Sequence, residues 1–156
     1  MTHQTQSIAV QQRITVQAPV QRAFDVFTAG IAGWWPLDGY SIGAEPAVTA
    51  MVEPREGGRW FERAADGTEC PWGHVRVWEP PHRVVLSWEI SCDWQPDPAA
   101  ASEVEVRFAP HEDGGTEVVL EHRGLEVYGE RAEQMRETFG SDGGWGGLLR
   151  RFAEAV

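Results

Sequence analysis

The sequence predicts one α+β domain in which a curved antiparallel sheet of about six or seven strands wraps around a long C-terminal α-helix. Two hydrophobic periods indicate this fold: apolar residues alternate with polar ones through most of the chain, and near the C-terminus they recur three and four positions apart. The 156 residues suffice for one domain with its own hydrophobic core. We therefore expect residues 1–156 to form a single domain.

The N-terminal part predicts a strand followed by two short helices. Apolar side chains alternate with polar ones from residue 8 to residue 16, as in a half-buried strand. Pro19 suits the first turn of a helix, and an apolar stripe follows it: Val20, Ala23, Phe24 and Phe27. A second short helix or turn carries Trp34 and Trp35 and ends before Pro36.

Residues 47–122 predict a meander of strands separated by turns rich in Gly, Pro and Asp. The later strands alternate clearly, and their polar face carries Glu103, Glu105, Glu117 and Glu121, so we expect that face to contact water. From Trp72 to Trp78 the alternation is ambiguous. We place Val75 and Val77 inward, and therefore His74 and the two tryptophans on the opposite face.

The C-terminal part changes to a helical period. Residues 130–139 are good helix formers, and a glycine-rich stretch at 140–144 interrupts them. The final segment carries an amphipathic stripe: Trp145, Leu148, Leu149, Phe152 and Val156. A helix of this length is marginal alone in water, so it must pack its stripe against the concave face of the sheet.

The composition excludes several classes of partner. The chain has 24 acidic residues against 13 basic ones, all arginine, and a net charge of −11. Nucleic acid and anionic membranes are therefore not expected partners. No apolar run approaches the roughly 20 residues of a membrane helix. The polar start lacks a signal-peptide pattern, so we expect a cytoplasmic protein with Cys70 and Cys92 reduced.

Polar residues that could perform chemistry are few. The five histidines and two cysteines show no metal-ligand spacing, Cys70 and His74 being an isolated pair, so we expect no metal, no cofactor and no assigned catalytic residue. Glu62 could share the face of Trp60 and act as an acid or ligand anchor. The favoured alternative places Glu62 and Arg63 on the surface of a hairpin. His122 is expected at a partly exposed strand end, and His74 on the outside.

Four segments of the chain resemble the SRPBCC superfamily: residues 53–60 (EPREGGRW), 78–88 (WEPPHRVVLSW), 103–108 (EVEVRF) and 143–152 (GGWGGLLRRF). Within it they resemble the branch named for homologues of an activator of the heat-shock chaperone ATPase, from about Ile14 to the end. The resemblance implies a helix-grip fold, whose cavity between sheet and last helix usually takes an apolar or amphipathic molecule. The same scaffold serves carriers, receptors, cyclases and co-chaperones, so it does not define a function.

Eight tryptophans are many for a chain of this size, and they either fill the core or line such a cavity. Trp88 and Trp145 are the firmest candidates for the lining, and Trp78 and Trp94 could lie on the outer face or in a loop. The predicted ligand-binding set is Trp34, Trp35, Trp60, Glu62, Trp88, Val106, Leu120, Phe139, Trp145, Leu148 and Leu149.

Three functions fit these observations. The favoured one is binding of an apolar or aromatic small molecule that enters between the last helix and the loops at 35–43 and 94–99. The second is a protein-interaction module that modulates a chaperone ATPase, for which the acidic sheet face is the only internal support. The third is a hydrolase or cyclase that uses Glu62 or His122 with cavity water. The chain could be a monomer or a homodimer.

Overall fold

The computed structural model describes residues 8–156; residues 1–7, which include His3, lie outside the described part. The elements follow in this order: β1 (Val10–Val16), α1 (Val20–Phe27), η1 (Ile31–Gly33), β2 (Ala47–Val52), β3 (Arg59–Ala64), β4 (Glu69–Glu79), β5 (Arg83–Trp88), η2 (Pro98–Ala100), β6 (Ser102–Pro110), β7 (Thr116–Arg123), η3 (Leu125–Arg131), α2 (Ala132–Gly140) and α3 (Trp145–Ala155).

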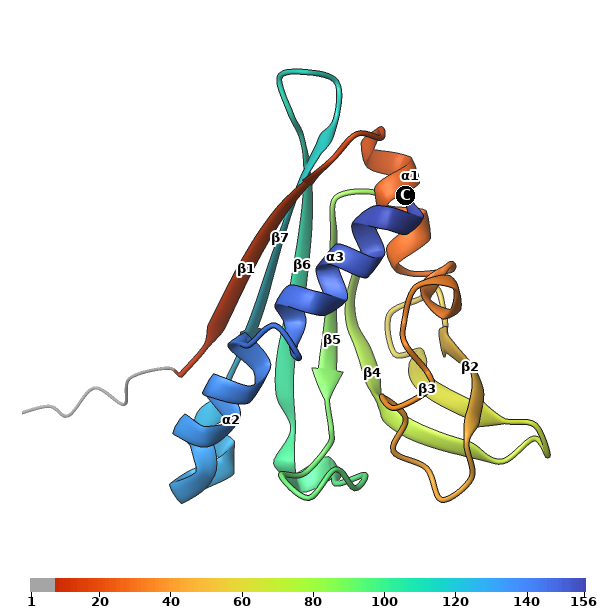
Figure 1. Cartoon of the computed structure of the whole chain (residues 1–156), viewed down its shortest axis with the longest axis vertical. Coiled ribbons are helices and arrows are strands. Elements are labelled where there is room, and N and C mark those ends of the chain that lie inside the picture. Colours follow the sequence, from red (N-terminus) through yellow and green to blue (C-terminus); the bar gives the residue numbers. More distant parts are fainter. Residues whose placement is uncertain (1–7) are drawn as a thin grey trace, which may run out of the picture.

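The seven strands form one antiparallel sheet in the order β1-β7-β6-β5-β4-β3-β2. The sheet curls, and α3 runs across its concave side from the end of α2 toward α1 (Figure 1). The predicted helix-grip fold is thus confirmed. The second short helix is a single 3₁₀ turn, η1, which ends at Gly33, so Trp34 and Trp35 follow it instead of lying within it.

Helix α3 packs as its stripe predicts. Trp145, Leu148, Leu149 and Phe152 are all buried, and Phe152 lies edge-on to Phe27 of α1 at a ring-centroid distance of 5.3 Å. The last helix and the first one therefore share one apolar core with the inner face of the sheet.

The predicted phase of β4 is correct at Val75 but wrong at Trp72 and Trp78, because two β-bulges interrupt its pairing, one opposite Trp60/Phe61 and one between Val75 and Val77. Each bulge shifts the alternation by one residue, so Trp72 and Val75 are both buried. Trp78 also faces inward, where its ring lies 5.1 Å from that of Phe24. His74 lies outside as expected, with 52% of its side chain exposed.

Gly73 allows the backbone of β4 to approach Trp60 and β5 closely. A Cβ at this position would lie 1.9 Å from the Ser87 carbonyl oxygen and 2.6 Å from Trp60 Nε1. The indole of Trp60 uses this space to donate a hydrogen bond of 2.7 Å to the Ser87 carbonyl. Only glycine fits there, because any side chain would overlap both groups.

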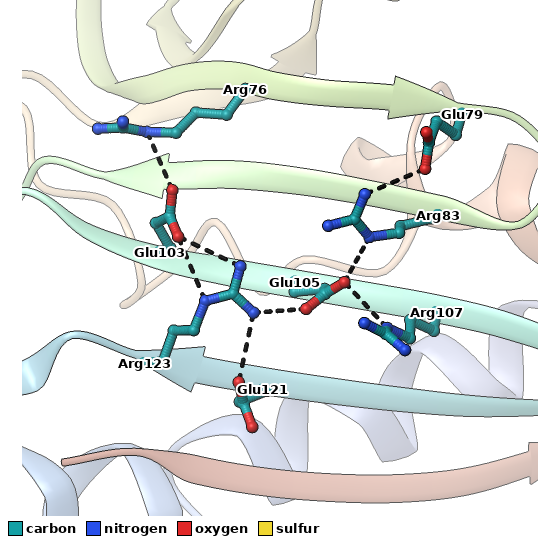
Figure 2. Close-up of polar contacts among 8 residues, drawn as sticks. All are labelled: Arg76, Glu79, Arg83, Glu103, Glu105, Arg107, Glu121 and Arg123. Carbon is teal, nitrogen blue, oxygen red and sulfur yellow. Dashed lines mark hydrogen bonds and ion pairs between the residues drawn. The ribbon is translucent and has the colours of Figure 1, made fainter. Parts of the chain in front are cut away.

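The convex face of the sheet is not simply acidic, which corrects the expectation that Glu105 contacts water. Only 7% of the Glu105 side chain is exposed, and its carboxylate pairs with three arginines, Arg83, Arg107 and Arg123 (Figure 2). Burial by itself raises the pKa of Glu105, but the hydrogen bonds from these arginines outweigh burial and lower the pKa to about 2.

This network spans four strands. Arg123 also contacts Glu103 and Glu121, Arg76 of β4 contacts Glu103, and Arg83 contacts Glu79 (Figure 2). Four arginines thus face four glutamates, and the charge of this surface is balanced.

We expect the substitution Glu105→Gln to lower the free energy of unfolding by about 2 kcal/mol, because it leaves three guanidinium groups around a neutral amide. Urea denaturation measures the change. The matched control Glu121→Gln removes the same charge from a side chain that is 37% exposed. It should cost less than about 0.5 kcal/mol, and equal losses in the two variants would contradict the central role of Glu105.

Candidate functional site

A cavity of about 280 Å³ lies between the sheet and the C-terminal helices. Seven segments supply its walls: the η1–β2 loop (residues 34–46), β4, β5, the β5–η2 segment (residues 89–97), α2, the α2–α3 junction (residues 141–144) and α3. The lining residues are Trp35, Gly39, Tyr40, Ser41, Ile42, Trp72, Trp88, Ile90, Trp94, Thr138, Phe139, Gly143, Gly144, Trp145 and Leu148. Aromatic rings therefore surround most of the space.

Five of the predicted ligand-binding residues border this cavity: Trp35, Trp88, Phe139, Trp145 and Leu148. The other six lie elsewhere. Trp34 packs between Phe27 and Phe152, Trp60 stands behind Trp72 and Trp88, and Val106, Leu120 and Leu149 are core residues. Glu62 is also set behind the wall.

Several lining residues were missed by the sequence analysis. Trp72 was placed on the outer face because its inward direction depends on the β-bulges. Tyr40, Ile42 and Trp94 belong to the two loops where a ligand was expected to enter. Their positions could have been inferred from that expectation, although no periodicity marks single loop residues.

Most of the indole N–H groups in the cavity wall donate hydrogen bonds to acceptors within the protein. Trp35 donates to the Tyr40 carbonyl at 3.3 Å, Trp72 to Glu62 Oε1 at 2.9 Å, and Trp145 to His122 Nδ1 at 3.0 Å. The rings consequently present carbon to the cavity. Among the described residues that line it, none is charged.

The N–H of Trp88 differs from the other three because it has no acceptor. Trp88 Nε1 is the one buried side-chain nitrogen or oxygen in residues 8–156 without a hydrogen-bond partner. Burial raises the pKa of Tyr128 to about 12, against the lowering effect of the adjacent Ser102 and Trp88 side chains. The Tyr128 hydroxyl itself donates to the Ile90 carbonyl at 2.7 Å.

The carboxylate of Glu62 organises one side of the cavity. It accepts hydrogen bonds from the backbone N–H of Ile42 at 2.6 Å, from that of Gly43 at 3.1 Å and from Trp72 Nε1. Glu62 is 2% exposed. The favoured prediction of a surface hairpin position is therefore wrong: Glu62 shares the inward face of Trp60, and the η1–β2 loop covers it.

Glu62→Gln should loosen the η1–β2 loop, because an amide NH₂ cannot accept the hydrogen bonds that one carboxylate oxygen now receives. We expect the free energy of unfolding to fall by about 1–3 kcal/mol and the amides of Ile42 and Gly43 to exchange faster with deuterium. Glu45→Gln, in an exposed part of the same loop, is the charge-matched control and should change neither quantity. Unchanged exchange at both amides of the Glu62 variant would disprove the anchoring role.

His122 supports the opposite side of the cavity. It is completely buried, against the expectation of a partly exposed strand end, because rings from β5, α2 and α3 pack against it. Since Nδ1 accepts from Trp145, Nε2 carries the proton and donates to Ser102 Oγ at 2.8 Å. Its ring contacts those of Trp88 and Phe139 at centroid distances of 5.2 and 4.4 Å.

Burial lowers the pKa of His122 to about 3 from an ordinary value of 6.5. The unfolded chain therefore takes up a proton below pH 6.5 that the folded protein excludes. We expect the free energy of unfolding to be fully retained above pH 6.5 and to fall as the pH decreases toward 3, by up to about 1.4 kcal/mol per pH unit.

Urea denaturation between pH 7 and pH 5 tests this dependence above the range in which Glu105 contributes. His122→Gln keeps an acceptor for Trp145 and a donor for Ser102 but cannot titrate. The variant should be less stable at pH 7 and show a flatter pH profile, and parallel profiles for the two proteins would exclude His122 as the origin of the slope.

The mouth of the cavity is formed by the exposed lining residues, namely Gly39, Tyr40, Trp94, Thr138 and Gly143. The Tyr40 hydroxyl donates to the Gly143 carbonyl at 2.5 Å and so connects the η1–β2 loop to the α2–α3 junction. Trp94, which is 41% exposed, has a backbone φ of 60° and lies edge-on to Phe139. The mouth is more polar than the interior because it includes hydroxyl groups and backbone.

No helix within residues 8–156 has the length and apolarity to cross a membrane. Within the same residues, no three His, Cys, Asp or Glu side chains are grouped so that they could hold a metal ion.

Comparison with known proteins agrees with this architecture. An anthrahydroquino-Gama-pyrone synthase, Txn09, solved in complex with SUM, is 37% identical, with 95% of this chain and 96% of that chain covered and a TM-score of 0.66. CalC, a self-sacrificing resistance protein from Micromonospora echinospora, is 28% identical, with 94% and 92% covered and a TM-score of 0.64.

Protein NE0264 from Nitrosomonas europaea is 14% identical over 94% of this chain and 92% of that one, with a TM-score of 0.66, and shows the fold alone. A search of curated proteins found no match. The family model described as "Activator of Hsp90 ATPase homolog 1-like protein" matches residues 17–156. Because that match covers most of the chain, the protein belongs to the Activator of Hsp90 ATPase homolog 1-like family within the SRPBCC superfamily.

Proposed function

We propose that the protein binds an apolar, aromatic small molecule in the cavity beneath α3. The observation that carries this proposal is the wall itself: Trp35, Trp72, Trp88 and Trp145 are buried around an unfilled space and their rings face it with carbon. The volume of about 280 Å³ lies near the lower end of ligand pockets, which span roughly 300–1,000 Å³.

Aromatic rings favour aromatic ligands over aliphatic chains of similar area. Offset-stacked and edge-to-face ring pairs contribute about 0.5–1.5 kcal/mol each beyond the burial of apolar surface. A planar molecule of about two or three fused rings suits such a wall and volume. The 37% identity with a protein described as an anthrahydroquino-Gama-pyrone synthase supports the same ligand class.

We expect anthracene-9-methanol to quench tryptophan fluorescence with an affinity on the order of micromolar, and 1-dodecanol to bind more weakly. Calorimetry provides the dissociation constants. Thr138→Phe should narrow the mouth and weaken binding at least about tenfold. Gln134→Phe lies one turn earlier on the exposed face of α2, outside the lining, and should leave binding unchanged.

Absence of binding by either compound, or equal affinity in both variants and the parent protein, would contradict the assignment of the cavity as the ligand site. Circular dichroism verifies that both variants remain folded.

The role as a chaperone-regulating module gains no specific support from the sheet face that suggested it. Glu103, Glu105 and Glu121 are paired with arginines within the sheet, so they do not form an acidic docking surface. Protein binding therefore stays a prediction that rests on the family name alone.

An enzyme acting on the same ligand class is the second candidate, favoured by the 37% identity with a synthase. Glu62 and His122 are unsuited to the catalytic roles considered for them, because neither borders the cavity and the polar atoms of both are engaged. Hydroxyl groups that do border it belong to Tyr40, Ser41 and Thr138. Mass spectrometry of a bound polycyclic quinone after incubation distinguishes turnover from simple binding.

A further inference from the structure

We infer that the cavity selects uncharged or positively charged aromatic molecules and rejects carboxylates. This inference rests on the proposed ligand-binding function and adds the charge of the ligand to it. It follows from the groups inside the cavity and from those around its mouth.

The interior offers nothing that could neutralise an anion. None of the described lining residues is an arginine or a histidine. The N–H groups of Trp35, Trp72 and Trp145 already donate to protein acceptors, so the N–H of Trp88 is the one indole donor among these four without a partner. A carboxylate placed there would lose its water without gaining a cation or a set of donors, which is strongly unfavourable.

The ligand must therefore enter with its apolar part first. The inner wall is made of buried rings and aliphatic groups, whereas Gly39, Tyr40, Thr138 and Gly143 at the mouth are exposed. An amphipathic molecule will keep its polar end at this mouth, where hydroxyl groups, backbone and water remain available.

The segments that form the mouth are rich in acidic residues. Each of four exposed lining residues is next in sequence to an exposed carboxylate, and the pairs are Asp38–Gly39, Asp93–Trp94, Glu137–Thr138 and Asp142–Gly143. Arg131 pairs with Asp93 at 3.2 Å and Arg150 with Asp142 at 3.5 Å. The residues that flank the mouth in sequence thus carry four carboxylates, and guanidinium groups pair with two of them.

The charge of the whole chain acts in the same direction. A net charge of −11 repels anions as they approach and attracts cations. A ligand with a neutral or cationic polar end can therefore bind with that end at the mouth. A ligand with an anionic end is disfavoured both as it approaches the protein and when it is bound.

The test uses one ring system with three substituents: anthracene-9-methanol, 9-(aminomethyl)anthracene as its ammonium, and anthracene-9-carboxylate. At pH 7 and low salt, calorimetry should find the alcohol and the ammonium bound and the carboxylate at least about tenfold weaker. High salt should reduce the difference between ammonium and carboxylate, because the rim charges are exposed and screened.

A matched pair of variants separates charge from shape. Thr138→Lys places a cation at the mouth, and Gln134→Lys makes the same change in net charge one turn away from it. Thr138→Lys should raise the affinity for the carboxylate by at least about fivefold and lower that for the ammonium. Gln134→Lys should change both by less than about twofold.

The outcomes distinguish this inference from the function on which it rests. Equal binding of carboxylate and alcohol, or no gain for the carboxylate in Thr138→Lys, overturns charge selection and leaves aromatic ligand binding intact. If none of the three compounds binds the parent protein, the proposed function fails and the inference fails with it.

Discussion

The hydrogen bond from Trp145 Nε1 to His122 Nδ1 joins the last helix to the sheet, and the cavity depends on it. Trp145 begins α3, while His122 lies near the end of β7 with no exposed surface. Apolar packing alone would let an indole turn at the start of a helix, because dispersion is not directional. A buried polar pair specifies one ring orientation, since breaking it leaves two unsatisfied groups away from water.

Glu62 fixes the orientation of an indole ring on the other side of the cavity in the same way, through buried hydrogen bonds. Its carboxylate binds the η1–β2 loop through two backbone N–H groups and the β4 wall through Trp72. Two polar groups set behind the rings thus hold the rings in place without facing a ligand. This arrangement explains how a wall rich in tryptophan can surround an empty space rather than collapse into it, and why the space is lined by carbon.

Much of the fold and part of the site were predictable from local pattern. The stripe of α3 and the alternation in β5, β6 and β7 follow from periods of 3.6 and 2, so these elements and the inward direction of Trp88 and Trp145 were inferred correctly. The direction of Trp72 was not, because a β-bulge reverses the alternation and leaves no clear mark in the sequence. Glu105 was expected in water because alternation cannot reveal three arginines on neighbouring strands.

The sequence by itself determined the order of the elements, the buried faces of α3, β5, β6 and β7, and the negative charge of the chain. These properties depend on residues close together in the chain or on residue counts. Only the tertiary structure decided which tryptophans border the cavity, that Glu62 and His122 are buried, and that the segments around Gly39, Trp94, Thr138 and Gly143 meet at one mouth. Those features bring together residues from opposite ends of the chain, such as Tyr40 and Gly143. Their proximity follows from the curl of the sheet, which no local pattern encodes.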